Sequence, residues 1–333
     1  MSERTVICLT PVKNEAWILE TFLAAASLWA DHIVVADQGS SDGSREIAAA
    51  HPKVMLVDNP SPEFDEHTRQ SLLVRAAREL TDTQRVLIAL DADEALAAST
   101  FAGAEWARAL EAAPGTAFRW RWANVLPDGE RVWVPAERLY FGVVDDGRRH
   151  SGARIHGVRV PVDPDGRRID FDQSVVLHLQ YLDWQRMKSK QAWYQCWETL
   201  ENGAKRPAAL YRQYHHMDAV PSASIRPLDR DWVAGYRRAG LDLTGAPRVG
   251  EAWWDREILD WMDEFGPRRF AKLDLWNVDW SARARELDHP IAEATDPRTA
   301  LDRAVGRWLC LTQRRARSTP IRILDLALRL FGW

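Results

Sequence analysis

Val86-Leu87-Ile88-Ala89-Leu90-Asp91-Ala92-Asp93-Glu94 decides the fold, because an apolar run of strand length ends there in three closely spaced acids. An uninterrupted apolar run is typical of a strand buried on both faces, and such strands occur inside parallel sheets covered by helices. Ligands of open α/β sheets bind beyond the carboxyl ends of the strands. Asp91 and Asp93 would therefore stand at a binding site, where two carboxylates offer hard oxygen ligands to Mg²⁺ or Mn²⁺. The alternative is an ordinary strand-to-loop turn, which aspartate also favours.

Strands and helices alternate before this stretch. Predicted strands cover residues 5–10, 32–37 and 54–57, and predicted helices cover residues 16–29, 44–50 and 65–80. Ser41 or Asp42 is expected to cap the helix at 44–50. This alternation predicts an α/β fold with a mostly parallel, Rossmann-like sheet flanked by helices.

Three motifs at strand ends resemble those of family 2 glycosyltransferases of the GT-A type. They are residues 10–15 (TPVKNE), Asp37 with residues 40–44 (SSDGS), and residues 91–93 (DAD). The resemblance covers about the first 95 residues well and is looser as far as Tyr194. It implies a nucleotide-sugar donor, with UDP favoured, and a divalent cation, Mn²⁺ or Mg²⁺. Such a cation would neutralise the charge that develops on a nucleoside diphosphate leaving group.

The resemblance also implies roles for single residues. The base and ribose would be bound by residues of the first two loops and of helix 65–80: Thr10, Pro11, Val12, Asn14, Glu15, Asp37, Asp42 and Arg69. Asp91 and Ala92 would face the ribose or the metal, and Asp93 would hold the metal that bridges the diphosphate. The alternative for Glu15 and Asp42 is helix capping, and for Arg69 it is a solvated helix face.

Residues 96–215 are predicted to form the acceptor half of the domain. A helix is expected at 99–113, strands at 117–125, 131–134, 137–141 and 174–179, and a polar loop at 142–152. In one branch of family 2, an Arg-Leu-aromatic strand precedes a His-Glu pair and then a second histidine. Residues 138–140 (RLY), His156 and His178 resemble that order, which implies that His178 is a metal ligand. A hydrogen-bonded histidine at a strand end is the alternative for His178.

The catalytic base stays open, because Gly157 stands where the resemblance calls for glutamate. Inverting transfer needs a carboxylate or an imidazole that takes the proton of the acceptor hydroxyl. The candidates are His156 itself, Asp145 and Asp146 of the polar loop, and Glu94 beside the metal site. His156 and the two loop acids are preferred over Glu94.

Residues 216–333 are predicted to form a mainly helical extension after a transferase domain at 1–215, whose nucleotide-binding half covers about 1–95. The chain has 17 tryptophans, mostly in its second half, and we expect those at helical spacing near 184–197 to be core packing. A basic run at 314–317 precedes an amphipathic helix at 321–333. This helix, taken to run from Ile321 to Trp333, suits an anionic membrane surface, or alternatively docking on the fold or on a partner subunit.

Composition narrows the function classes. The formal net charge of -4 gives no reason to expect a nucleic-acid partner. Three widely spaced cysteines form neither a disulfide framework nor a zinc spacing, and no secretory signal or membrane span is evident. A cytoplasmic protein is expected, peripheral to the inner face of the membrane if the amphipathic helix binds there.

The sequence thus predicts a metal-dependent, inverting glycosyltransferase that moves a sugar from a nucleotide-sugar to a hydroxyl of a saccharide or glycolipid, such as an envelope or lipid-linked saccharide. The alternative is a non-catalytic nucleotide- or carbohydrate-binding protein on a transferase scaffold. A nucleotidyltransferase is more remote, because the first strand is not followed by a glycine-rich phosphate loop.

Overall fold

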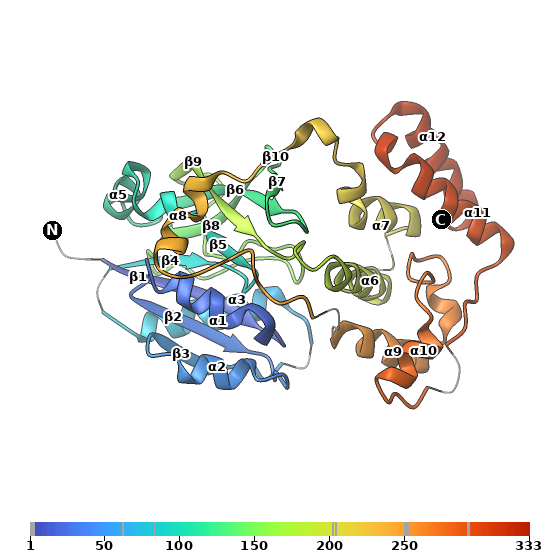
Figure 1. Ribbon diagram of the computed structural model, residues 1–333, viewed down its shortest axis with the longest axis horizontal. Coiled ribbons are helices and arrows are strands. Elements are labelled where there is room, and N and C mark those ends of the chain that lie inside the picture. Colours follow the sequence, from blue (N-terminus) through green and yellow to red (C-terminus); the bar gives the residue numbers. More distant parts are fainter. Residues whose placement is uncertain are drawn as a thin grey trace. The chain divides into compact units, whose positions relative to one another are not determined.

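The computed structural model describes residues 4–61, 63–82, 84–201, 203, 205–249, 253–291 and 294–333. The chain divides into two compact units (Figure 1). Unit 1 comprises the residues up to Leu182 together with Arg226–Arg248, and unit 2 comprises Asp183–Ile225 and Val249–Trp333. This division differs from the predicted boundary near residue 215, because α6 (Trp184–Glu201) packs against the later helix α9 (Trp253–Phe265).

A mixed sheet forms the centre of unit 1. Its strand order is β10-β7-β6-β8-β4-β1-β2-β3, and β9 pairs with β5 and β6. The parallel part consists of β1 (Thr5–Val12), β2 (His32–Asp37), β3 (Val54–Asp58) and β4 (Arg85–Ala89). The remaining strands are β5 (Glu94–Leu96), β6 (Ala117–Val125), β7 (Arg131–Trp133), β8 (Arg138–Val144), β9 (Arg168–His178) and β10 (Ile225–Pro227).

Helices cover both faces of the parallel strands (Figure 1). On one face α1 (Ala16–Ala26) and α2 (Ser44–Ala50) pack against alternate residues of β1 such as Val6 and Cys8. On the other face α3 (Glu66–Glu79) packs against Ile7 and Leu9. One strand therefore serves two hydrophobic cores, as expected for a strand with no polar face. The predicted α/β class is confirmed.

Several predicted bounds differ from those observed. β1 continues through Pro11, which is tolerated because the pairing of β1 with β4 ends at Leu9 and Ala89, so no β4 residue needs the missing N–H. The predicted helix at 99–113 is two helices, α4 (Ala98–Phe101) and α5 (Ala104–Glu111). The predicted loop at 142–152 starts later, because β8 runs to Val144 and Gly142 packs closely on β4.

The segment Arg226–Arg248 returns the chain to unit 1 and contains helix α8 (Arg230–Arg238). The hydroxyl of Tyr236, which is buried, donates a hydrogen bond of 2.6 Å to the carbonyl oxygen of Leu96. A Cβ atom at Gly235 would lie 2.8 Å from the Cβ of Ala98, so only glycine allows this close approach of α8 to α4. Unit 1 is therefore built from two separate stretches of sequence.

Unit 2 is mainly helical and rich in tryptophan, as predicted. Its helices are α6, α9, α7 (Pro207–Tyr214), α10 (Trp280–Glu286), α11 (Ala300–Thr312) and α12 (Thr319–Leu328), with short 3-10 turns η1 (His216–Ala219), η2 (Ser222–Ser224), η3 (Pro267–Phe270), η4 (Gln313–Arg315) and η5 (Arg329–Phe331). Trp193 is buried beside Trp197 and Trp261, and its indole N–H donates to Glu257 over 2.8 Å. In the described part of the chain, no helix is long and apolar enough to cross a membrane.

Candidate functional site

The acidic turn after β4 is anchored on both sides by backbone hydrogen bonds. The amide of Asp91 donates to Oε2 of Glu94 over 2.9 Å, and the amide of Glu94 donates to the carbonyl oxygen of Asp91 over 3.0 Å. Glu94 begins β5, where it pairs with His178 of β9, and the amide of Leu179 donates to the carbonyl oxygen of Asp93 over 2.7 Å. This pairing brings His178 beside the acidic turn, although more than 80 residues separate them along the chain.

The carboxylate of Glu94 is fully buried and fully used by its neighbours. Its Oε1 accepts a hydrogen bond of 2.8 Å from the indole of Trp122, and its Oε2 is paired with Arg159. Burial raises the pKa of Glu94 to about 7, against the attraction of Arg159 and with further repulsion from Asp91 and Asp93. These partners occupy both oxygens of the carboxylate, and Glu94 thereby supports the acidic turn.

Arg159 is the residue of this site that the sequence did not reveal. Its Nη2 lies 2.9 Å from Oδ2 of Asp91, and its Nη1 pairs with Glu94. The guanidinium also lies over the rings of Trp122 and Phe141, at 5.5 and 5.2 Å from their centroids. The carboxylates of Asp91 and Glu94 outweigh burial and hold the pKa of Arg159 above its ordinary value. Arg159 lies outside any strand or helix, so no periodicity or motif marked it.

The ring of His178 is oriented by Asn124 and Trp122. Nδ1 of His178 lies 3.0 Å from Oδ1 of Asn124, and the amide nitrogen of Asn124 donates to the carbonyl oxygen of Trp133 over 3.4 Å. The second bond favours the orientation in which Oδ1 of Asn124 faces the histidine, where it can accept a proton carried on Nδ1. Trp122 stacks on the ring at 4.5 Å. Metal-binding histidines are held in this way by a hydrogen bond from their other nitrogen.

A protein-only metal cage is absent. Among the residues that the structure describes, no group of three or more His, Cys, Asp or Glu side chains is arranged to hold a metal ion. Mg²⁺ is nevertheless usually bound by one or two protein carboxylates, with substrate phosphates and waters as the other ligands. Asp93 and His178, which are both buried and meet at the acidic turn, have the chemistry of such a partial site, and Asp91 pairs with Arg159 beside them. The donor chemistry therefore fits a cation completed by a diphosphate.

The two loops of the predicted nucleotide half are joined to each other. The amide of Asn14 donates to Oγ of Ser40 over 2.9 Å, and the amide of Ser41 donates back to Oδ1 of Asn14 over 2.7 Å. The amide of Glu15 donates to Oγ of Ser44 over 2.8 Å. Asn14 adopts a left-handed backbone with φ of 56°, a conformation that asparagine tolerates. These bonds fix the β1–α1 turn against the β2–α2 loop.

Helix capping was the alternative prediction for Asp42, and its carboxylate does bind the first amides of two helices, α1 and α2. Its Oδ1 accepts from the amide of Ser44 over 3.0 Å at the start of α2, and its Oδ2 accepts from the amide of Ala16 over 2.9 Å at the start of α1. Glu15 precedes α1 without a capping bond, and its carboxylate accepts from the indole of Trp17 over 2.7 Å. Capping therefore accounts for Asp42 and leaves Glu15 without a capping role.

The other residues predicted to contact the nucleotide are mostly buried, and they differ in which of their atoms a ligand could contact. Asp37 is buried at the end of β2 and accepts weak bonds from the amide of Ser40 and from Arg45. Val12 and Ala92 pack into the hydrophobic core, so only their backbone atoms would touch a ligand. Thr10 is buried, and its hydroxyl has no hydrogen-bond partner in the described structure. Pro11 lies within β1, between Thr10 and Val12.

Arg69 is held against α3 and the nearby Phe64 and is not a solvated side chain. Its guanidinium lies 4.9 Å from the ring centroid of Phe64 and 3.7 Å from a carboxylate oxygen of Glu66 one turn earlier in α3. The side chain is mostly buried, and its Nε has no hydrogen-bond partner in the described structure. Arg69 therefore keeps donor capacity at the amino end of α3, which follows β3.

Asp145 and Asp146 lie at the wrong edge of the sheet for catalysis, which corrects their prediction as bases. β8 is antiparallel to β4, and the amide of Asp145 donates to the carbonyl oxygen of Arg85 at the beginning of β4. Asp91 is the sixth residue after Arg85, which is about 20 Å along an extended chain. These two acids therefore cannot act on a substrate held at Asp91 and Asp93.

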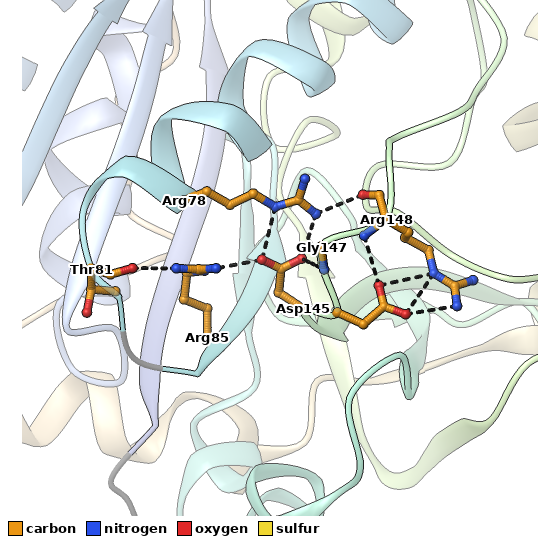
Figure 2. A network of polar contacts seen from close by, with 7 residues as sticks. Arg78, Thr81, Arg85, Asp145, Gly147 and Arg148 are labelled. Atoms are coloured by element: carbon orange, nitrogen blue, oxygen red, sulfur yellow. Dashed lines mark hydrogen bonds and ion pairs between the residues drawn. The ribbon is translucent and has the colours of Figure 1, made fainter.

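Asp145 instead forms the centre of a charged network (Figure 2). Its carboxylate accepts bonds of 2.6 and 3.0 Å from Arg78 and one of 3.2 Å from Arg85, and Arg78 also donates to the carbonyl oxygen of Arg148. Burial alone would raise the pKa of Asp145, but the bonds from Arg78, Gly147 and Arg85 hold it below its ordinary value. The network fastens β8 to α3 and β4.

Asp146 has its own partner in the same network. Its carboxylate accepts bonds of 2.9 and 3.1 Å from the Nε of Arg148. Burial opposes these bonds, but they hold the pKa of Asp146 below its ordinary value. Like Asp145, it is a poor base.

His156 lies at the edge where the acids are. The amide of the next residue, Gly157, donates to Oε2 of Glu66 over 2.9 Å at the beginning of α3, and Arg159 follows two residues later. His156 is exposed and has a left-handed backbone with φ of 55°, which is rare for a residue other than glycine. A Cβ atom at Gly157 would lie 2.8 Å from the carbonyl oxygen of Ala153, so this loop excludes the glutamate that the resemblance called for.

Comparisons with known proteins give partial matches. No family model matches the chain, and no curated protein matches it. A structure of glucosyl-3-phosphoglycerate synthase from Mycobacterium tuberculosis with Mg²⁺ and uridine diphosphate is 16% identical, with a TM-score of 0.24, over 38% of this chain and 45% of that one. 4-diphosphocytidyl-2C-methyl-D-erythritol synthase is 18% identical, with a TM-score of 0.27, over 54% of this chain and 75% of that one. A structure described as a mycobacterial protein is 15% identical, with a TM-score of 0.28, over 36% of this chain and 42% of that one.

This chain spans less than half the length of the mycobacterial structures that it matches. At this level of likeness, the matches identify neither the family nor the activity of this chain.

Proposed function

We propose that unit 1 is a metal-dependent, inverting glycosyltransferase of the family 2 type, which uses a nucleotide-sugar, with UDP favoured, and an acceptor hydroxyl. The observation that carries the proposal is the convergence of Asp93, His178 and the Arg159–Asp91 pair at the carboxyl end of β4. Ligands of open α/β sheets bind at this edge. Two neighbouring loops, at Asn14 and Asp42, are already fixed beside each other.

In this proposal the cation, Mn²⁺ or Mg²⁺, would be held by Asp93 and His178 and would neutralise negative charge on the departing diphosphate. Asn124 would keep the Nε2 lone pair of His178 aimed at the ion. Glu15 and Asp37 would accept hydrogen bonds from the base and ribose. Arg69 would donate to the nucleotide from the amino end of α3. Arg159 would supply further positive charge, since guanidinium groups bind phosphate oxygens well.

His156 is the proposed base, because its loop reaches the acidic turn through Arg159. Glu94 is buried with three partners, and Asp145 and Asp146 are paired with arginines at the opposite edge. His156 is exposed on the loop that carries Arg159, so an acceptor could approach it from solvent. As general base, its imidazole would take the proton from the acceptor hydroxyl as that oxygen attacks the anomeric carbon.

A saccharide or glycolipid acceptor and a cytoplasmic location are parts of the same proposal. Cys8, Cys196 and Cys310 are all free thiols, which fits a reducing compartment. The rival function is a non-catalytic nucleotide- or carbohydrate-binding protein. It is favoured by the absence of the expected glutamate at Gly157, and it differs in having no turnover.

The deciding experiment measures UDP binding by calorimetry with Mn²⁺, and UDP release from a panel of UDP-sugars. We expect Asp93→Asn to weaken Mn²⁺-dependent UDP binding at least tenfold and to abolish release, because one of two protein ligands loses its charge. Asp165→Asn, an exposed loop acid remote from β4 in sequence, is the matched control and should bind and turn over normally. Binding without release in the wild-type protein would favour the rival, and unchanged binding in Asp93→Asn would refute the metal site.

A further inference from the structure

The segment 298–333 of unit 2 has a charge opposite to that of the whole chain. It contains eight arginines and two aspartates, a formal charge of +6, whereas the chain as a whole carries -4. Both aspartates are engaged internally. Asp302 closes a capping box with Thr299 at the start of α11, and Asp325 accepts bonds of 3.0 and 3.1 Å from Arg212. Arg298 and Arg303 pair with Asp296, just before the segment, and the remaining arginines of the segment exceed its own acids.

One side of α12 is docked within unit 2. Leu328 and the nearby Trp333 pack in a small hydrophobic core with residues of α7 and α11, among them Tyr211 and Leu309. Arg212 of α7 joins the three helices, because it binds Asp325 of α12 and also donates to the carbonyl oxygen of Leu309 over 2.7 Å. The docked helix expected as one alternative is thus observed for this side.

The other side of α12 and the turn η5 expose large apolar side chains. These residues, here called the apolar face, are Ile323, Leu324, Leu326, Leu330 and Phe331, with exposed fractions of 61, 47, 55, 86 and 60%. Leu311 of α11 is exposed as well, at 83%. Scattered exposed leucines are ordinary, but five large apolar residues within nine positions form a patch that calls for a partner.

We propose that the apolar face binds the surface of an anionic membrane. Arg322 and Arg329 are exposed, lie two helical turns apart, and are next to the apolar face. An amphipathic helix with arginines beside an apolar face inserts its side chains at the level of the headgroups, while the arginines contact lipid phosphates. The basic run at 314–317, which directly precedes α12, adds to this attraction.

A second copy of the chain fits this face less well than a lipid surface. A symmetric dimer through α12 would bring two segments of charge +6 together, and like charges across an interface oppose association. An anionic lipid surface instead complements the charge and covers the apolar side chains. This proposal stands on unit 2 alone and does not depend on the transferase proposal.

The test is co-flotation of the full chain with vesicles, compared between phosphatidylcholine alone and phosphatidylcholine mixed with phosphatidylglycerol. We expect flotation with the mixed vesicles and little with the neutral ones. Leu330→Ser with Phe331→Ser should abolish it, and both residues are exposed, so the fold should persist. Arg322→Gln with Arg329→Gln should lower the partition constant about 25-fold, since each charge near an anionic surface is worth roughly a factor of five.

Matched controls test whether flotation depends on the apolar face itself or on exposed charges and apolar side chains in general. Arg237→Gln with Arg238→Gln removes two exposed charges from α8, and Leu28→Ser removes an exposed apolar side chain from unit 1. Both should float like the wild type, and circular dichroism should confirm that every variant is folded. The proposal is overturned if the wild type does not float with the mixed vesicles, or if the face variants float as well as the wild type. It is also overturned if the wild type forms a concentration-dependent dimer that binds no vesicles and the serine variant is a monomer.

Discussion

The Nη2 of Arg159 lies 2.9 Å from Oδ2 of Asp91, so the first acid of the acidic turn is already neutralised by the protein itself. The same guanidinium pairs with the buried Glu94. A cation that enters this site therefore meets one fixed positive charge. The proposed ion would then lie on the side of Asp93 and His178.

Arg159→Gln should destabilise unit 1 by about 3 kcal/mol, because Glu94 would stay buried without its counter-charge. Urea unfolding measures this cost. Mn²⁺ should raise the melting temperature of the variant more than that of the wild type, since the acids then lack a neutralising partner. The control is Arg154→Gln in the same loop, whose ion pairs are exposed and should contribute under about 1 kcal/mol. Equal Mn²⁺ effects on variant and wild type would show that Arg159 does not share the ion's surroundings.

Asn124→Leu should lower the affinity for Mn²⁺ in the presence of UDP by about 10- to 100-fold, because the ring of His178 would lose the bond that favours a proton on Nδ1. Asn124→Asp keeps the acceptor and should restore most of the affinity, which separates positioning from loss of packing. Calorimetry with UDP and Mn²⁺ measures both variants. A leucine variant that binds Mn²⁺ as the wild type does would contradict the role of His178 as a ligand.

His156→Gln should lower the turnover of UDP-sugar by about 10²- to 10⁴-fold, the usual contribution of a general base. UDP affinity should stay the same, because His156 is proposed to contact the acceptor and not the donor. His51→Gln, at the end of α2, is the control and should keep full turnover. If His156→Gln turns over normally, the base is another group.

Asp145→Asn should cost about 3 kcal/mol of stability while leaving turnover per folded molecule unchanged, since it breaks a buried ion pair far from the acidic turn. The pKa of Asp145 is lowered in the folded state, so its contribution is complete above the ordinary value of 3.8 and is lost as the pH falls through the lowered folded-state pKa. The variant should therefore lose less stability than the wild type during acid titration, as followed by melting temperature. A loss of turnover without a loss of stability would return Asp145 to the catalytic candidates.

The parallel half of the sheet was predictable from local patterns. Strands such as His32–Asp37 are apolar runs that end in an acid, and burial on both faces leaves little choice of neighbours. The strands of the acceptor half were harder to predict. β5 has only three residues, and β8 continues to Val144 through Gly142, a residue type that is common in loops. The misplacement of Asp145 has the same origin. Its edge of the sheet depends on β8 being antiparallel to β4, and no local pattern encodes that.

Within the site, contacts between residues that are far apart in the sequence could not be predicted from local motifs. The pairing of β5 with β9 sets Glu94 opposite His178, and the role of His178 as a metal ligand stays a prediction. Arg159 was missed, because an arginine in an irregular loop differs in no way from the solvated arginines of this chain until the fold closes around it. Asn124 lies in the strand predicted at 117–125, and its contact with His178 follows only from the parallel pairing of β6 with β9.

The return of residues 226–248 to the sheet has a consequence for biosynthesis. Helix α8 places Tyr236 against Leu96, so the sheet of unit 1 stays incomplete until the ribosome has translated the first helices of unit 2. Part of the apolar surface of residues 1–182 therefore stays uncovered until residues 226–248, more than forty positions later, have been synthesised. Chaperone dependence during translation, and failure of any gene fragment that stops at residue 182, are the natural outcome of that delay.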